Sequence, residues 1–149
     1  MEAGVETEPS YTHIVTVEPG DIDELDHANN VAYVRWIQDA AVAHSEAVGL
    51  GFQGYVKLGG VFVIRRHEVD YLRSALRGDR LRVRTRISSV SAVQCERRTS
   101  VTRESDGIEL ARAATIWVYV DAKSGKPVRI PNEVHDAFGI PRRQRTSQT

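Results

Sequence analysis

One long helical pattern followed by strand after strand is the feature that most constrains the fold. Between about Asn30 and Val48, apolar and small residues recur at helical spacing, which predicts a single amphipathic α-helix. A helix of this kind cannot bury its apolar face alone, so we expect an antiparallel sheet to wrap it in an α+β domain. The strands after the helix are predicted over residues 61–72, 80–90, 92–103 and 110–121.

The segment "RLRVRTRISSV" (80–90) shows the strand alternation most clearly. Leu81, Val83, Thr85 and Ile87 share one face, and arginines occupy the other. We therefore expect an outer sheet face that carries an arginine row. Another strand is predicted over 11–19, a short helix near Pro131, and a glycine-punctuated loop between the long helix and residue 61. The sheet should have five to six strands, and successive strands joined by short turns should be antiparallel neighbours.

Length and charge narrow the class of protein. The 149 residues fit one domain, expected over 11–140, with a disordered lead-in (1–10) and a flexible basic tail (141–149). The formal net charge is zero, which argues against nucleic acid as a partner. Cys95 is the only cysteine, so no intrachain disulfide is expected. With no signal-peptide pattern and no apolar run long enough to cross a membrane, we expect a cytoplasmic protein.

The loop "GDIDELDHANNVAYVRW" (20–36) concentrates polar side chains just before the helix. Calcium binding is disfavoured, because Leu25 and Ala32 fall where an EF-hand loop needs ligands. Helix capping explains Asn29 or Asn30, but it does not explain the clustered acids. A helix N-terminus can stabilise a developing oxyanion, and an upstream carboxylate can act as base or nucleophile. Together they suit acyl transfer from an activated ester.

This loop resembles that of the hotdog-fold acyl-CoA thioesterases, in the 4-hydroxybenzoyl-CoA thioesterase-like family. The segments "HEVDYLRSALRGDRLRVRTRI" (67–87) and "ARAATIWVYVDAKSGKPVRIP" (111–131) extend the resemblance over most of the chain. It implies a hotdog fold, in which the sheet wraps one central helix. It also implies a homodimer joined edge to edge, often a homotetramer, with active sites between subunits. Neither a metal nor another cofactor is required.

The resemblance also assigns roles within the loop. It makes Asp23 the catalytic carboxylate and gives the oxyanion role to backbone amides near Asn30 and Val31. The remaining positions that match the family pattern support the site: His27, Asn29 and Tyr33. Many relatives have glycine at the position of Asp26.

The implied substrate is an acyl-CoA, which would be hydrolysed to free coenzyme A and a carboxylic acid. Arginine suits phosphate groups, so the candidates for binding coenzyme A are Arg65, Arg66, Arg73, Arg97 and Arg98. Trp36, Phe62 and Val63 are candidates for the acyl pocket. Two alternatives stay open, a hotdog acyl-thioester dehydratase and a non-catalytic acyl-CoA-binding module. The acyl group, the choice between coenzyme A and a carrier protein, and the base or nucleophile role of Asp23 also stay open.

Overall fold

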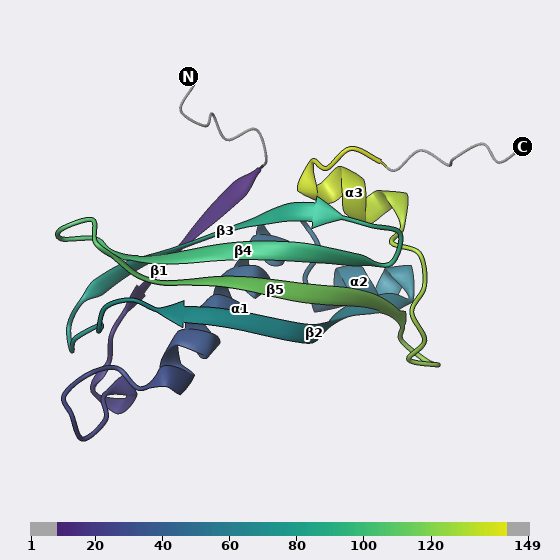
Figure 1. Cartoon of the computed structure of the whole chain (residues 1–149). Helices are drawn as coiled ribbons and strands as arrows, with labels where there is room; N and C mark the ends of the chain where they lie inside the picture. Colours follow the sequence, from purple (N-terminus) through teal and green to yellow (C-terminus); the bar gives the residue numbers. More distant parts are fainter. Residues whose placement is uncertain (1–8, 143–149) are drawn as a thin grey trace, which may run out of the picture.

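The computed structural model describes residues 9–142, in which a five-stranded antiparallel sheet lies against one long helix (Figure 1). The expected lead-in and basic tail lie mostly outside these residues. No helix in this range is both long and apolar enough to cross a bilayer. In chain order the elements are β1 (Ser10–Thr16), a 3-10 turn (Pro19–Asp21), α1 (Asn30–Ala47), α2 (Phe52–Leu58), β2 (Gly60–Tyr71), β3 (Arg80–Val90), β4 (Gln94–Arg103), β5 (Glu109–Asp121) and α3 (Asn132–Phe138).

The helix-facing side of the sheet forms the core, as the alternation predicts. Leu81, Val83 and Thr85 are fully buried, whereas the arginines between them are exposed or nearly so. On α1, Ala32 and Ala40 are also fully buried. Such small side chains let the helix axis approach the sheet closely. The expected α+β hotdog arrangement is therefore confirmed, with five strands.

The strand order is β1-β3-β4-β5-β2, so β2 and β3 are not neighbours although they follow one another in the chain. The expectation that successive strands joined by short turns are neighbours was therefore wrong for β2 and β3, and right for β3–β4 and β4–β5. Residues 72–79 cross beneath the start of α1, where Ala28 N donates to Ala75 O at 2.9 Å. This crossing leaves β1 and β2 as the two edges of the sheet, and it holds the loop before α1 in place.

The segment between α1 and β2 was predicted as a loop, and it contains α2. Gly51 and Gly59 bound this helix, and Gly59 adopts the left-handed conformation (φ 78°) that favours glycine at a helix end. Gly54 lies inside α2, where a Cβ atom would come within 2.8 Å of Gly49 O. The glycines therefore permit a tight corner rather than an irregular loop. Contacts such as the edge-on packing of Tyr55 against Phe62 hold α2 to β2.

Candidate active site

The loop that carries Asp23 is closed by its own backbone. Asp23 N donates to His27 O at 2.9 Å, and Ile22 bridges to Ala28. The carboxylate of Asp23 is exposed, and its Oδ1 accepts hydrogen bonds from Leu25 N (2.9 Å) and His27 N (3.4 Å). Its Oδ2 has no hydrogen-bond partner among residues 9–142. The Asp23 carboxylate is thus oriented by two amides while one oxygen remains available.

The first turn of α1 follows directly. Asn29 is the N-cap residue, and its Oδ1 accepts from Ala32 N at 3.0 Å, which confirms the capping interpretation. The amides of Asn30 and Val31 donate to no group in the described part of the chain, and the Val31 side chain is 73% exposed. Helix starts leave such amides unpaired and partly positive. The loop therefore presents a carboxylate and two free N–H groups within one short segment.

The other acids of this loop have structural explanations. Asp21 is buried, accepts a hydrogen bond from Glu18 N at 2.9 Å, and forms an ion pair with Arg35. Asp26 is exposed and adopts a positive φ of 63°. Glycine tolerates this conformation most easily, and aspartate is among the few other residues that do so. The acid cluster thus divides into a buried anchor, a turn residue and the candidate Asp23.

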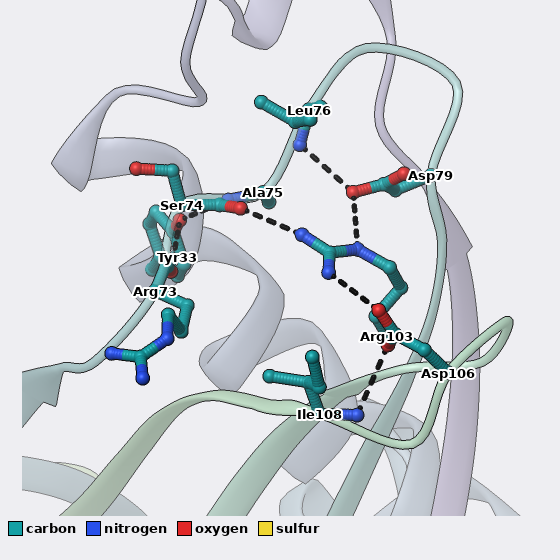
Figure 2. A network of polar contacts seen from close by, with 9 residues as sticks. All are labelled: Tyr33, Arg73, Ser74, Ala75, Leu76, Asp79, Arg103, Asp106 and Ile108. Atoms are coloured by element: carbon teal, nitrogen blue, oxygen red, sulfur yellow. Dashed lines mark hydrogen bonds and ion pairs between the residues drawn. The ribbon is translucent and has the colours of Figure 1, made fainter.

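Tyr33 lies in the core and fastens the crossing segment to α1 (Figure 2). Its hydroxyl accepts from Ala75 N at 2.8 Å and donates to Arg73 O at 3.4 Å. Burial raises the pKa of Tyr33, so the hydroxyl stays protonated and able to donate. In these contacts Tyr33 supports the loop that underlies the helix start.

Arg103 ties the same crossing segment to the turn between β4 and β5 (Figure 2). Its guanidinium bonds to Asp79 Oδ2 (3.0 Å), Asp106 Oδ2 (2.9 Å) and Ser74 O (2.9 Å). Such a planar fork satisfies three acceptors in fixed directions. The segment that supports α1 is therefore held from both sides, by Tyr33 and by Arg103.

Four of the five candidate arginines for coenzyme A are exposed. Arg65 bonds to Gln94, Arg66 and Arg98 form ion pairs with Glu68 and Glu96, and Arg73 bonds to Leu72 O. The outer face also has a hollow of about 300 Å³, lined by interleaved arginines and acids.

Arg97 does not belong with the other four, and grouping it with Arg98 was wrong. Successive strand residues point to opposite faces, so Arg98 faces outward while Arg97 faces α1. Arg97 is only 5% exposed. A buried guanidinium on the inner face cannot reach a coenzyme A phosphate on the outer surface.

An apolar cavity of about 260 Å³ lies at the other end of α1, between its C-terminal half, α2 and the inner face of the sheet. Of the three residues expected at the acyl pocket, only Phe62 lines this cavity, whereas Trp36 is a core residue and Val63 is 44% exposed. Cys95 also lines it, and burial raises the pKa of this thiol to about 11, which argues against a nucleophilic thiolate. Residues from seven helices and strands line the cavity, so local sequence patterns did not reveal it.

Within one chain this cavity and the Asp23 loop are far apart. Asn30 is eleven positions before Ala41 on α1, and Ala41 lines the cavity. At about 1.5 Å per residue, that separation is about 17 Å along the helix. Among residues 9–142, no cluster of three or more His, Cys, Asp or Glu side chains could hold a metal ion.

A central helix against an antiparallel sheet, with an oriented carboxylate before the helix start, defines a hotdog-fold protein with a candidate acyl-transfer site. Residues 17–138 match the thioesterase-like superfamily, and the chain belongs to that family. The expected hotdog-fold thioesterase family is therefore confirmed.

The relatives and solved structures to which this chain is similar include proteins named as thioesterases. The chain is 24% identical over 119 residues to the chloroplastic acyl-acyl carrier protein thioesterase ATL2 of Arabidopsis thaliana, covering 80% of this chain and 63% of that protein. A 1,4-dihydroxy-2-naphthoyl-CoA thioesterase from Synechocystis shares the fold, with a TM-score of 0.80, 21% identity, and coverage of 87% of this chain and 96% of that one. For a DHNA-CoA thioesterase from Staphylococcus aureus the TM-score is 0.79, the identity 16%, and the coverage 87% and 89%.

Proposed function

We propose that this protein hydrolyses acyl thioesters, with acyl-CoA as the substrate and Asp23 as the catalytic carboxylate. Membership of the thioesterase-like superfamily supports the reaction. The observation that carries the assignment is the exposed Asp23 carboxylate, held by two loop amides just before the unpaired N–H groups of Asn30 and Val31.

In the proposed reaction, the Asn30 and Val31 amides polarise the thioester carbonyl. As a base, Asp23 takes a proton from water while the water oxygen bonds to the carbonyl carbon. The C–S bond then breaks, and the thiolate leaves with that proton as a free thiol. As a nucleophile, Asp23 would instead form an anhydride that water hydrolyses to the same products. His27, Asn29 and Tyr33 support the site, through the turn, the helix cap and the crossing segment.

We further propose that the working site lies between two copies of the chain, in a homodimer that can pair again into a tetramer. β2 is an edge strand with exposed apolar side chains, including Val63 (44%) and Tyr71 (44%). It runs from the cavity, at Phe62, to the helix start, where Tyr71 OH donates to Asn30 O at 3.4 Å. Antiparallel pairing of β2 with itself about a two-fold axis would bring each helix start beside the other copy's cavity.

The deciding experiment is a hydrolysis screen over acyl-CoAs, with release of free thiol as the readout. Acyl-acyl carrier protein substrates belong in the same screen, because the plant relatives are named for them. Asp23→Asn should fold normally and lose roughly 10²–10⁴-fold in rate, the range for a positioned base. The matched control is Asp26→Asn, which removes a carboxylate from the same exposed loop and should keep the rate.

An unchanged rate in Asp23→Asn would reject Asp23 as the catalytic carboxylate. Tight binding of acyl-CoA with no thiol release from any substrate would instead favour a non-catalytic binding module.

A further inference from the structure

Arg97 is a buried cation whose protein partners are all uncharged. Its Nη1 donates to His44 Nδ1 at 2.9 Å and to Thr85 Oγ1 at 3.0 Å. The Phe138 ring lies 5.8 Å from its guanidinium carbon. Within residues 9–142 both side-chain hydrogen bonds of Arg97 come from Nη1, so Nε and Nη2 have no partner there, and no carboxylate lies within ion-pair distance. Arg97 is thus a buried guanidinium with unused donors and no counterion.

Burying an unpaired charge in this way lowers the stability of the folded protein unless another group compensates for the charge. Buried charges in proteins are normally paired, because removing a charge from water costs several kcal/mol that only a partner offsets. The ionisable groups that face Arg97 are neutral at pH 7. Burial, together with the Arg97 charge, lowers the pKa of His44 to about 4, and burial raises the pKa values of Cys95 and Tyr55. None of these groups supplies a negative charge.

The cavity described above places Arg97 where a ligand could reach it. Phe52 (76% exposed) and Val42 (52%) line its open side, whereas Arg97 (5%) and Cys95 (6%) line its buried side. Trp117 also lines the cavity, and its buried Nε1 has no hydrogen-bond partner among residues 9–142.

Two side chains at this cavity, Arg97 and Trp117, can therefore donate hydrogen bonds but not accept them. The surrounding wall is mostly apolar, with Ala41, Leu50 and Phe62 among its residues. The acidic residue that lines the cavity, Glu46, is exposed and forms no ion pair with Arg97. The cavity therefore suits a ligand with an apolar body and an acceptor-only, negatively charged end.

We propose that the acyl group of the substrate ends in a carboxylate, so that the substrate is the monothioester of a dicarboxylic acid. This proposal rests on the proposed thioesterase function and names its substrate class. The methylenes occupy the apolar wall, and the distal carboxylate binds the free Nε and Nη2 of Arg97 as a two-pronged pair, with Trp117 Nε1 as a further donor. The thioester end then points to the open side, where the proposed pairing of β2 would bring a second copy's helix start.

The test compares substrates that differ only at the distal end: adipoyl-CoA against hexanoyl-CoA, and suberoyl-CoA against octanoyl-CoA. A site with buried donors rejects analogues that lack the matching acceptor, so we expect kcat/KM to favour each dicarboxylic member by roughly 10²-fold or more. Arg97→Met should abolish or reverse this preference, and Arg97→Lys, which keeps the charge but not the fork, should retain part of it. Replacing a buried charge with an apolar side chain is often tolerated, and urea unfolding would verify that Arg97→Met folds.

The matched control is Arg112→Met. Arg112 lies on the outer face of the adjacent strand β5, exposed and paired with Glu109 at 2.8 Å. This variant should keep the dicarboxylic preference. Equal rates on both members of each pair in the wild type, or a preference that survives Arg97→Met, would overturn the proposal.

A binding measurement separates this proposal from the proposed function. Binding of adipate and hexanoate to the Asp23→Asn protein is measured by titration calorimetry, a measurement that does not depend on turnover. Adipate should bind at least about tenfold more tightly, a difference of about 1.4 kcal/mol, and Arg97→Met should remove the difference. If adipate binds selectively but the wild type hydrolyses no acyl thioester, the proposed thioesterase function is rejected and the carboxylate site at Arg97 is supported. If the wild type hydrolyses acyl-CoAs but adipate binds no more tightly than hexanoate, the carboxylate site is rejected and the thioesterase function is supported.

Discussion

At the scale of single residues, His44 makes the stability of the protein depend on pH. It is buried on the inner face of α1, where Tyr11 stacks on it and Arg97 donates to its Nδ1. Burial, and then the Arg97 charge, lower the pKa of His44 from 6.5 to about 4. The ring is therefore neutral at pH 7, with the proton on Nε2.

This shift predicts that the protein loses stability as the pH falls below about 6.5. Between pH 6.5 and pH 4 the unfolded chain binds a proton at His44 that the folded chain does not, so acid favours unfolding. From pH 7.5 to pH 5.0 the loss from His44 should be about 2 kcal/mol. The pKa of His67 is also lowered by burial, so it adds to the wild-type loss.

Urea unfolding of the wild type and of His44→Gln at the two pH values would isolate the contribution of His44 to the loss of stability. The glutamine variant keeps a side-chain acceptor for Arg97 but cannot titrate. We expect its pH dependence to be shallower by about 2 kcal/mol. Identical pH dependence in the two proteins would contradict the assignment.

At the scale of elements, the hydroxyl of Tyr33 joins α1 to the segment that crosses beneath it. Tyr33→Phe would leave the fully buried Ala75 N–H without its acceptor. We expect a loss of about 1–3 kcal/mol in the free energy of unfolding, the cost of an unsatisfied buried donor. Denaturant unfolding measures it, with Tyr71→Phe as the control. The Tyr71 hydroxyl makes only a 3.4 Å contact to Asn30 O near the surface, and a loss as large in that variant would argue against a buried-donor effect.

The helices and strands also show which features of the fold could be predicted from the amino-acid sequence. α1 and the long strands follow from apolar periodicity, because each has one face in the core and one in water. α2 was missed because its glycines resemble loop punctuation, whereas packing on β2 stabilises it as a helix. Arg97 was grouped with Arg98 as a coenzyme A candidate because the two arginines are adjacent, although strand parity alone could have separated them. The cavity depends on tertiary packing, and the catalytic role of Asp23 remains a prediction.

At the scale of the whole molecule, the separation of the Asp23 loop from the cavity leads to a prediction about assembly. If each site combines the loop of one copy with the cavity of another, two variants that are inactive for different reasons can complement each other in a mixed dimer. Asp23→Asn removes the carboxylate. Val42→Trp places a large ring where the half-exposed Val42 borders the open side of the cavity. Each variant alone should be inactive in the thiol-release assay.

Mixing the two variants after unfolding and refolding should restore activity. Random pairing makes half of the dimers mixed, and each mixed dimer holds one site with an intact Asp23 and an open cavity, so about a quarter of wild-type activity should return. Refolding each variant alone is the control, since it accounts for gains from refolding itself. A site contained within one chain cannot be repaired in this way, because every chain in the mixture carries a defect in its own loop or its own cavity. Mixed dimers, observed by mass, that show no activity would therefore place the Asp23 loop and the cavity in the same chain's site, or in no common site.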